Sequence, residues 1–222
     1  MSNNSMEKKY YLTEADGKVY ESETRGRLGG YRGGGERNVY GLMNCPAALR
    51  ALAAPTHASY ESHRVFFADE LTALSAGYRP CGVCLKSRYL KWREDPAEYA
   101  EAVRDGVFPG ARKHEMGLSR KYFDFVKCGT KRVELRLFDE KRRGIMVGDM
   151  ISFSCEEESV TVRVIDLILR DSFEEIAREE PIELLADKTV TPDELLSDLA
   201  KFYPSERQKE YGVVGIRFEV IE

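Results

Sequence analysis

Residues 129–138, Gly-Thr-Lys-Arg-Val-Glu-Leu-Arg-Leu-Phe, alternate in the manner of a β-strand. Successive side chains of a strand point to opposite faces of its sheet, so Arg132, Glu134 and Arg136 share one face. The other face is apolar and begins with Lys131. We expect the apolar face to pack inward, whereas the charged face either lies in solvent or lines a groove.

Basic residues continue beyond this strand, in the turn that precedes Val147-Gly148-Asp149 and the next expected strand. Because this turn follows closely, its basic side chains and the charged strand face are predicted to form one positively charged cleft. In that cleft Glu134 would hold the arginines in place or accept a hydrogen bond from the amino group of a base, as carboxylates do with cytosine. The predicted ligand-binding residues of the cleft are Lys131, Arg132, Glu134, Arg136, Lys141, Arg142 and Arg143.

The composition of the 222-residue chain is that of an ordinary globular protein, with 42% hydrophobic and 32% charged residues. No apolar run approaches the roughly 18 residues needed to cross a bilayer, and the polar first residues lack the apolar core of a secretory signal. The five cysteines argue against a disulfide framework and for free thiols in a reducing compartment. We therefore expect a cytoplasmic protein without a membrane partner.

The net charge of −4 conceals a strong asymmetry along the chain. Residues 24–93 carry 11 Lys and Arg against 4 Asp and Glu, and residues 112–143 carry 11 against 5, whereas residues 144–222 carry 8 against 19. The two basic stretches favour a nucleic-acid or phosphate-bearing partner. The pI near 5.6 instead favours a ligand that is not a polymer, since strong nucleic-acid binders usually have a pI above about 9.

The order of short strands and helices predicts an α+β protein with two domains. An N-terminal segment covers residues 1–23 and is followed by a first domain over residues 24–104. The Pro/Gly-rich residues 105–111 are expected to form a linker, and residues 112–222 the second domain.

A Gly- and Arg-rich stretch, residues 25–35, opens the first domain, and no packed element is expected from it. Guanidinium groups suit phosphate oxygens, and glycines let a backbone approach closely. Arg32 and Arg37 are therefore candidate contacts to a phosphate backbone. The alternative is a flexible, solvated loop.

Cys81-Gly82-Val83-Cys84 is the strongest indication of a metal site in this chain. Two thiolates three positions apart on a Gly-containing turn can face one ion, although a single pair also suits a redox site. Further ligand types upstream favour the metal. The predicted Zn²⁺ ligands are Cys45, His63, Cys81 and Cys84, with His57 as the alternative histidine. In a domain this small the zinc is expected to supply stability.

Several short sequence motifs between residues 29 and 84 occur together in the order in which one known domain has them. They are Tyr31-Arg32, Val39-Tyr40, Cys45-Pro46, residues 64–67 and the specific run Gly77-Tyr-Arg-Pro-Cys-Gly-Val-Cys84. This set resembles the metal-binding domain of the Ada methylphosphotriester-repair protein, in which four cysteines bind zinc and the first accepts a methyl group. The resemblance implies a small zinc-stabilised α/β module with Cys45, Cys81 and Cys84 as ligands. It places Gly41 at the acceptor position, and glycine can neither bind zinc nor accept a methyl group, so phosphotriester repair is not expected.

A second set of motifs spans residues 114–153, with a closing strand at residues 211–216. It consists of Gly129, Lys131, Glu134, Arg136, Arg142-Arg143, Val147-Gly148-Asp149, Ile151 and Phe153. This set resembles the ASCH domain, and the likeness covers nearly all of residues 112–222. The resemblance implies a PUA-like β-barrel with flanking helices, and a cleft above the barrel that recognises RNA or another nucleic acid.

The resemblance to ASCH proteins leaves three functions open. The first is non-catalytic binding of nucleic acid, preferably single-stranded RNA, whose bases can stack on tyrosines such as Tyr122 or Tyr211. The second is a hydrolase or ribonuclease acting on RNA or a modified nucleoside, with Lys131 and Glu134 as catalytic residues. Some small ASCH proteins hydrolyse acylated cytidine with a lysine that corresponds to Lys131, but Glu134 stands where they have a threonine. The third is a regulator that binds a small ligand.

The charged residues of the strand could also have a purely structural role instead of binding a ligand. Lys131, Glu134 and Arg136 would then form a set of ion pairs that closes the barrel, as such networks commonly do on strands.

Overall fold

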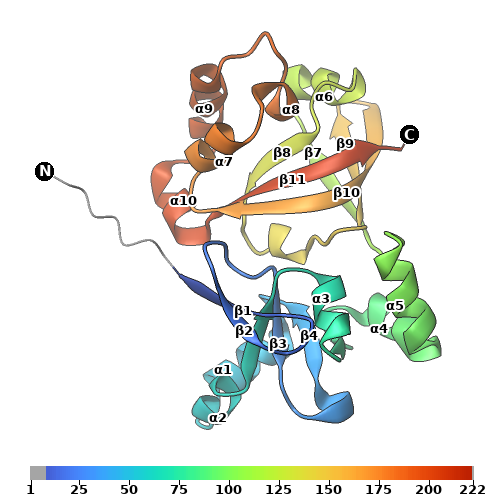
Figure 1. Ribbon diagram of the computed structural model, residues 1–222. Helices are drawn as coiled ribbons and strands as arrows, with labels where there is room; N and C mark the ends of the chain where they lie inside the picture. The colour runs from blue at the N-terminus through green and yellow to red at the C-terminus, as the bar shows by residue number, and fades with distance from the viewer. Residues whose placement is uncertain (1–8, 222) are drawn as a thin grey trace, which may run out of the picture. The chain divides into compact units, whose positions relative to one another are not determined.

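The computed structural model describes residues 9–221, which form two compact units divided between Gly110 and Ala111. Each unit combines its own sheet with helices (Figure 1), so the expectation of an α+β protein is confirmed. The first eight residues of the expected N-terminal segment, residues 1–23, lie outside the described residues. No helix formed by residues 9–221 is both long and apolar enough to cross a membrane.

The N-terminal unit is built on a four-stranded sheet and a two-stranded hairpin. Its strands are β1 (Tyr10–Thr13), β2 (Val19–Ser22), β3 (Leu28–Tyr31), β4 (Val39–Leu42), β5 (Arg64–Phe67) and β6 (Arg79–Pro80). Its helices are the 3-10 helix η1 (Gly35–Arg37), α1 (Pro46–Ala53), α2 (His57–Glu61), α3 (Glu70–Ser75), α4 (Lys86–Glu94) and α5 (Pro96–Arg104). The larger sheet has the order β5-β3-β4-β6, in which β4 and β6 are parallel and the other neighbours antiparallel.

Strand β3 lies inside this sheet, so the prediction of a loop over residues 25–35 is wrong at Leu28–Tyr31. The strand pairs with β4 along one edge and with β5 along the other. Crowding explains the glycine at position 30. A Cβ on Gly30 would lie 2.8 Å from Val65 Cγ2 and 2.9 Å from Phe67 Cε2. Glycines usually indicate a loop, but a strand with close neighbours also requires residues without side chains.

A buried carboxylate connects three helices of this unit to strand β4. Glu70 of α3 accepts hydrogen bonds from Arg88 of α4, from Tyr99 of α5 at 2.9 Å, and from Tyr40 of β4. Burial raises the pKa of Tyr40 and of Tyr99, and the charge of Glu70 adds to the increase. Both phenols therefore stay protonated and donate. Strand β4, which also carries Gly41, is thereby held firmly against the helices.

The C-terminal unit contains one five-stranded sheet with the order β7-β9-β10-β11-β8, and only the pair β7-β9 is parallel. Its strands are β7 (Lys113–Gly117), β8 (Val133–Leu137), β9 (Met150–Cys155), β10 (Glu158–Arg170) and β11 (Val213–Val220). Its helices are α6 (Arg120–Lys127), the 3-10 helix η2 (Arg142–Gly144), α7 (Phe173–Glu179), α8 (Ile182–Leu185), α9 (Pro192–Ala200) and α10 (Ser205–Tyr211). The sheet curls into a half-barrel (Figure 1), which is consistent with the expected PUA-like fold.

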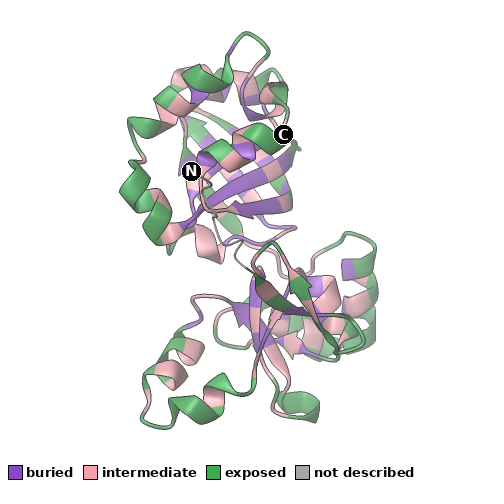
Figure 2. Ribbon diagram, turned by 60° about the vertical axis from the view of Figure 1, so that its left-hand side comes forward, coloured by how far each residue is buried: buried purple, intermediate pink, exposed green. Residues whose placement is uncertain are grey.

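Strand β8 confirms the alternation that the sequence predicts for its apolar face. Val133, Leu135 and Leu137 are buried in one hydrophobic cluster with residues of α7, α8 and α9. A second cluster is formed mainly by β9, β10, β11 and α6. Burial is accordingly high in the strands and lower in the helices, whose outer surfaces are exposed (Figure 2). Glu134 and Arg136 project from the opposite face of β8.

A second buried carboxylate fixes β7 against the start of β9. Asp149, with 0% of its surface exposed, accepts hydrogen bonds from the backbone nitrogens of Arg112 at 2.9 Å and Met146 at 3.1 Å. His114 Nε2 lies 2.8 Å from Oδ2, the oxygen that also accepts from Met146, whereas Oδ1 accepts from Arg112. The Val-Gly-Asp motif therefore acts here as a structural turn.

Candidate ligand pocket and metal site

A pocket of about 450 Å³ lies in the C-terminal unit between β8, the start of α6, and α9 with the segment that follows it. It is lined by Gly117, Leu118, Ser119, Lys121, Tyr122, Lys131, Glu134, Leu135, Arg136, Leu195, Asp198, Leu199, Lys201, Phe202 and Tyr203. We call it the β8 pocket. Three of the charged residues predicted from the sequence, Lys131, Glu134 and Arg136, are among its lining residues.

The three charged side chains form one chain of ion pairs. Lys131 Nζ lies 3.2 Å from Glu134 Oε2, and Arg136 Nε lies 2.9 Å from Glu134 Oε1. Lys131 and Glu134 are buried. Each carboxylate oxygen can accept more than one hydrogen bond, so Glu134 keeps acceptor capacity for a ligand.

The position of Lys131 differs from the prediction that it shares a face with Val133 and Leu135. Strand β8 begins at Val133, so the alternation does not extend back to Lys131. Its Nζ instead donates to Val133 O at 2.7 Å and to Leu185 O, in addition to the contact with Glu134. Burial lowers the pKa of Lys131, and the neighbouring carboxylate of Glu134 opposes this shift. With three acceptors around three N–H groups, the ammonium is fully engaged.

Arg136 connects both edges of the curled sheet. From edge strand β8 its Nη2 donates to the carbonyl of Gly117, at the end of edge strand β7, over 2.8 Å. Its Nη1 donates to Tyr203 Oη over 2.6 Å. Although burial lowers the pKa of Arg136, Glu134 and Tyr203 more than compensate, so the guanidinium stays charged. Arg136 is therefore a fixed part of the pocket floor.

The rim of the β8 pocket is organised by Asp198 of α9. Its carboxylate accepts hydrogen bonds from Lys201 at 2.6 Å, from Tyr122 at 3.0 Å and from Lys121 at 3.2 Å. These contacts lower the pKa of Asp198 to about 2, with Lys201 contributing most. Burial and then the hydrogen bond to Asp198 raise the pKa of Tyr122, which remains a neutral phenol.

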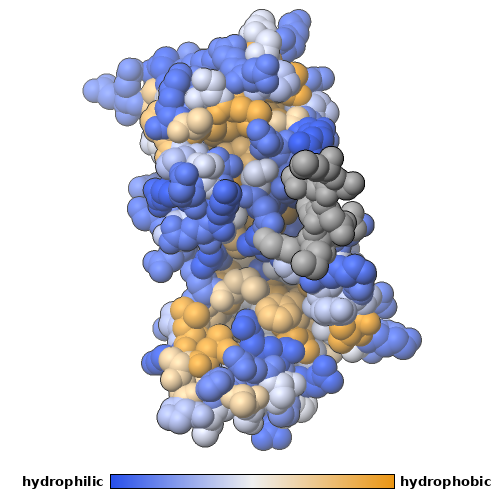
Figure 3. Space-filling view, turned by 90° about the vertical axis from the view of Figure 1, so that its left-hand side faces the viewer, coloured by the Kyte–Doolittle hydropathy of each residue, from blue (hydrophilic) through white to orange (hydrophobic). Residues whose placement is uncertain are grey.

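Aromatic side chains form a large part of the wall. Tyr122, Phe202 and Tyr203 all line the pocket, and Phe202 exposes 69% of its surface. Figure 3 shows apolar side chains gathered in a patch on a largely hydrophilic face of this unit. Sequence reasoning named Tyr122 but missed the residues of α9 and of the segment that follows. In the sequence, only the aromatic residues Phe202 and Tyr203, next to the end of a helix, indicated that this region could belong to a binding site.

The remaining basic residues of the expected cleft do not line the β8 pocket. Lys141 and Arg142 line a second pocket of about 450 Å³ with His114 and Gly117. Since Gly117 lines both pockets, the two adjoin at the end of β7. The single cleft predicted from the sequence is thus divided between two pockets.

Arg143 and Arg132 line neither of these pockets. Arg143 Nε donates to Phe138 O over 2.9 Å, and its guanidinium lies over the Phe138 ring. The backbone nitrogen of Arg132 donates to Leu184 O, and its guanidinium would contact a Cβ at Gly129. Both arginines therefore belong to local packing rather than to the pocket.

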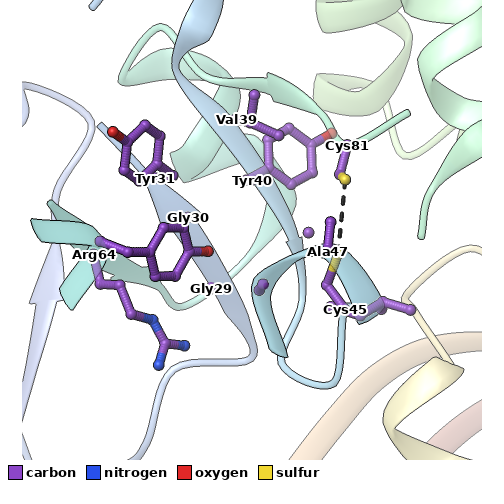
Figure 4. A pocket seen from close by; sticks show the side chains of 13 residues that line it. Gly29, Gly30, Tyr31, Val39, Tyr40, Cys45, Ala47, Arg64 and Cys81 are labelled. Carbon is purple, nitrogen blue, oxygen red and sulfur yellow. Dashed lines mark hydrogen bonds between the residues drawn. The ribbon is translucent and has the colours of Figure 1, made fainter. Parts of the chain in front are cut away.

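Three cysteines meet in the N-terminal unit, at the edge of its larger sheet. The sulfurs of Cys45, Cys81 and Cys84 all lie within 4.8 Å of one another, and Cys45 Sγ is 3.8 Å from Cys81 Sγ (Figure 4). Cys45 stands directly before α1, and the other two lie between β6 and α4. Such a group of thiols suits a soft or borderline cation, of which Zn²⁺ is the commonest in proteins.

The three thiols influence one another's ionisation. Hydrogen bonds from Cys45 and Cys84 lower the pKa of Cys81, and the same two neighbours raise the pKa of Cys84. The hydrogen bonds among the three sulfurs thus favour the thiolate at Cys81 and the thiol at Cys84. A bound cation would remove this difference, because it stabilises all of the thiolates together.

Neither histidine lies in the cysteine cluster, so the structure does not bring the expected fourth ligand to the sulfurs. His63 is exposed, and its Nδ1 lies 2.8 Å from Ser59 O and 3.0 Å from Ser62 Oγ. His57 is also exposed, at the start of α2. Local contacts at the end of α2 therefore hold the His63 ring away from the cluster.

Gly41 is the residue that does face the cluster. A Cβ built on Gly41 would lie 2.7 Å from Cys84 Sγ and 3.1 Å from Cys81 Cβ. Arg32 and Arg37 of the Gly-rich stretch are exposed and line neither the cysteine site nor its neighbouring pocket.

Comparison with known proteins identifies the C-terminal unit. Residues 116–222 match the sequence profile of the ASCH domain. Two solved structures are each similar to about half of the chain. The crystal structure of hypothetical protein PH0355 has 39% sequence identity, covers 49% of this chain and 99% of its own, and has a TM-score of 0.46. The solution NMR structure of protein PF0455 from Pyrococcus furiosus has 36% identity, covers 50% and 98%, and has a TM-score of 0.43.

The comparison with curated proteins found no match. The Ada-like resemblance of the N-terminal unit stays a prediction. For the other half of the chain, the profile match spans nearly all of the unit that holds the β8 pocket. The C-terminal unit of this chain is an ASCH domain.

Proposed function

We propose that this protein binds single-stranded nucleic acid, preferably RNA, through the β8 pocket of its ASCH domain. The observation that carries the proposal is the combination of a fixed carboxylate with aromatic walls. Glu134 is held on the pocket floor by Lys131 and Arg136, and Phe202 lies exposed at the edge. ASCH domains are generally linked to RNA binding, which agrees with this chemistry.

The pocket suits a single unstacked base of the nucleic acid. A base has two flat faces and an edge rich in donors, and proteins recognise it by stacking on aromatic rings and by hydrogen bonds to that edge. Tyr122, Phe202 and Tyr203 supply the rings. Glu134 can accept from an exocyclic amino group, the contact that carboxylates make with cytosine.

Basic groups beside the pocket would contact the phosphates that flank such a base. Lys121 and Lys201 lie on its rim, and Lys141 and Arg142 line the adjoining pocket. Arg32 and Arg37 are exposed and stay candidate phosphate contacts of the N-terminal unit by itself. A strand that crosses Gly117 from one pocket to the other would meet cations on both sides.

In the N-terminal unit, we propose that Cys45, Cys81 and Cys84 hold Zn²⁺ and that the ion stabilises this unit. The donor set supports a thiophilic ion, and all five cysteines are free of disulfides. Free thiols agree with a reducing compartment such as the cytoplasm.

A hydrolase that uses Lys131 as base or nucleophile is less well supported. The three contacts of its ammonium occupy every N–H group, and release of Val133 O or Leu185 O would take this donor away from a buried carbonyl. We therefore assign Lys131 and Glu134 to ligand recognition and to the pocket floor rather than to catalysis.

Fluorescence anisotropy with short labelled RNA and DNA strands at two salt concentrations tests the proposal. Wild-type protein should bind RNA, and more weakly at high salt because each neutralised phosphate releases counterions. Phe202→Ala should weaken binding by about 1–3 kcal/mol, the range for one base stacked on an aromatic ring. Its matched control is Tyr11→Ala, which removes an aromatic ring that is 62% exposed in the other unit.

Equal binding by Phe202→Ala and Tyr11→Ala would contradict the β8 pocket as the binding site. If no strand binds even at low salt, the nucleic-acid proposal fails. Binding of a free nucleoside instead would then support the small-ligand regulator. Turnover of labelled RNA or of an acylated nucleoside would restore the enzymatic alternative.

A further inference from the structure

Gly117 leaves an open passage between the two pockets of the C-terminal unit. It stands at the end of β7, and a Cβ built on it would have none of the described atoms within 4 Å beyond its chain neighbours. Its carbonyl accepts from Arg136 Nη2 at 2.8 Å, so the backbone is fixed at this point. The β8 pocket and its neighbour therefore adjoin across bare backbone, and one ligand can extend from the first into the second.

The neighbouring pocket, which we call the β7 pocket, has a volume of about 450 Å³ and a basic lining. Strand β7 contributes residues 114–117, and Lys141, Arg142 and Ile145 also line the pocket. The side chain of Lys141 is exposed. Arg142 Nη1 donates to Asp139 Oδ2 over 3.0 Å, which steadies the guanidinium, and no described residue occupies Nε or Nη2. Both cations can therefore reach a ligand in the pocket.

His114 is the third basic side chain of this lining, and a buried carboxylate fixes its ring. The Nε2 atom lies 2.8 Å from Oδ2 of Asp149, a residue with 0% of its surface exposed. Both oxygens of Asp149 accept from backbone N–H groups, as a carboxylate does, so Nε2 carries the hydrogen of this contact. Because that edge of the ring is turned to Asp149, Nδ1 is the ring nitrogen that a ligand in the β7 pocket can reach.

We propose that the β7 pocket binds a phosphomonoester, the terminal phosphate of the strand whose unstacked base enters the β8 pocket. The inference rests on the proposed function of the β8 pocket. Two cations and the carboxylate of Glu115 give the lining of the β7 pocket a formal charge of +1 when His114 is neutral and +2 when it is protonated. A phosphodiester inside a strand carries about one negative charge, whereas a phosphomonoester carries about −1.5 to −2 at pH 7. The protonated pocket therefore matches the end of a strand.

A phosphate dianion completes this charge balance through His114. The imidazole then lies between the Asp149 carboxylate at Nε2 and the phosphate at Nδ1, and two neighbouring anions favour its protonated form. Phosphate binding therefore takes up a proton, and His114 donates from both ring nitrogens. The other charged groups near the ring are Arg112, Glu115, Lys141 and Arg142.

Competition between strands that differ only at their ends tests this assignment. Short RNAs of one sequence, with hydroxyl, 5′-phosphate or 3′-phosphate ends, displace an internally labelled RNA from the full-length protein, and fluorescence anisotropy follows the displacement. At about pH 6.5 a phosphorylated strand should compete roughly tenfold better than the hydroxyl strand, the effect of about one charge-assisted hydrogen bond. At about pH 8.5 this advantage should shrink, because fewer protons are available to His114 while the phosphate stays a dianion.

A nucleoside 5′-monophosphate is the further competitor, because a free nucleotide carries the same phosphomonoester as the end of a strand. It should compete more weakly than the phosphorylated strand, which adds contacts along its backbone. Competition as strong as that of the strand would overturn the strand end as the source of the phosphate.

Three variants assign the effect to the β7 pocket. His114→Gln keeps an N–H group for Asp149 but cannot gain a proton, so the advantage of the phosphorylated strand should no longer depend on pH. Lys141→Met should reduce the advantage, whereas the control Lys188→Met removes an exposed lysine outside both pockets and should not. Gly117→Leu fills the passage without removing a charge, and because its Cβ has space, the protein should fold and lose the advantage.

Failure of this inference is distinguishable from failure of the proposed function. If no strand binds at either pH, the proposed function of the β8 pocket fails. If strands bind equally well with and without a terminal phosphate, that function stands and the phosphate site is refuted. An advantage that persists unchanged in Lys141→Met and Gly117→Leu would overturn its assignment to the β7 pocket.

Discussion

Replacement of Lys131 with methionine tests whether this lysine is a structural group. Methionine keeps the apolar stem and removes the ammonium with its contacts to Val133 O, Leu185 O and Glu134. A buried acceptor that loses its partner costs about 1–3 kcal/mol, and removal of one member of a buried ion pair costs about 3–5 kcal/mol. Glu134 keeps Arg136 as a partner, so we expect the lower end, about 3 kcal/mol.

Urea denaturation can report this loss for one unit at a time. The single tryptophan, Trp92, lies in α4, so its fluorescence follows the N-terminal unit, whereas far-ultraviolet circular dichroism follows both units. With a slope of about 1–3 kcal/mol per molar urea, a loss of about 3 kcal/mol lowers the midpoint of the C-terminal unit by about 1–3 M. The midpoint of the unfolding transition that Trp92 fluorescence follows should not change.

The matched control is Lys188→Met, which removes an exposed lysine and should change stability by no more than about 0.5 kcal/mol. If Lys131→Met behaves like this control, the ammonium is not a structural group, and a catalytic role for Lys131 becomes the better explanation. A joint shift of the Trp92 transition would show that the two units unfold together.

Three further predictions concern the metal site and the pocket rim. Metal analysis should find about one zinc per chain, and its chelation should lower the Trp92 unfolding midpoint; metal-free protein of unchanged stability would contradict the site. Incubation with methylphosphotriester DNA should leave every cysteine unmodified by mass spectrometry, because Gly41 provides no thiol, and a methylated Cys45 would show that the motif is misaligned. The pKa of Asp198 is lowered to about 2, so its contribution to stability is complete above the unfolded value near 3.8 and is lost as the pH falls through 2. In thermal unfolding experiments, the stability of Asp198→Asn should therefore fall less between about pH 5 and 2 than the stability of the wild type. Identical dependence of the unfolding temperature on pH in the two proteins would refute the assigned contacts.

Local patterns in the sequence determined much of each unit. The alternation in residues 133–137 predicted which side chains of β8 are buried, because a strand directs successive side chains to opposite faces. The spacing of Cys81 and Cys84 predicted a shared site, because a short turn holds both thiols close together. Glu134 and Arg136 were predicted to act together for the same reason of local geometry.

The distant groups that these residues meet depend on how the whole chain folds. The ammonium of Lys131 finds Leu185, and the wall opposite β8 comes from α9 and from Phe202 and Tyr203, far along the chain. Strand β3 forms despite its glycines because two neighbouring strands satisfy its backbone, and His63 is kept from the cysteines by contacts at the end of α2. The sequence determined periodicity and spacing, which depend on the geometry of a few consecutive residues. Partners were decided by long-range packing, because a side chain binds whatever group the folded chain brings within reach.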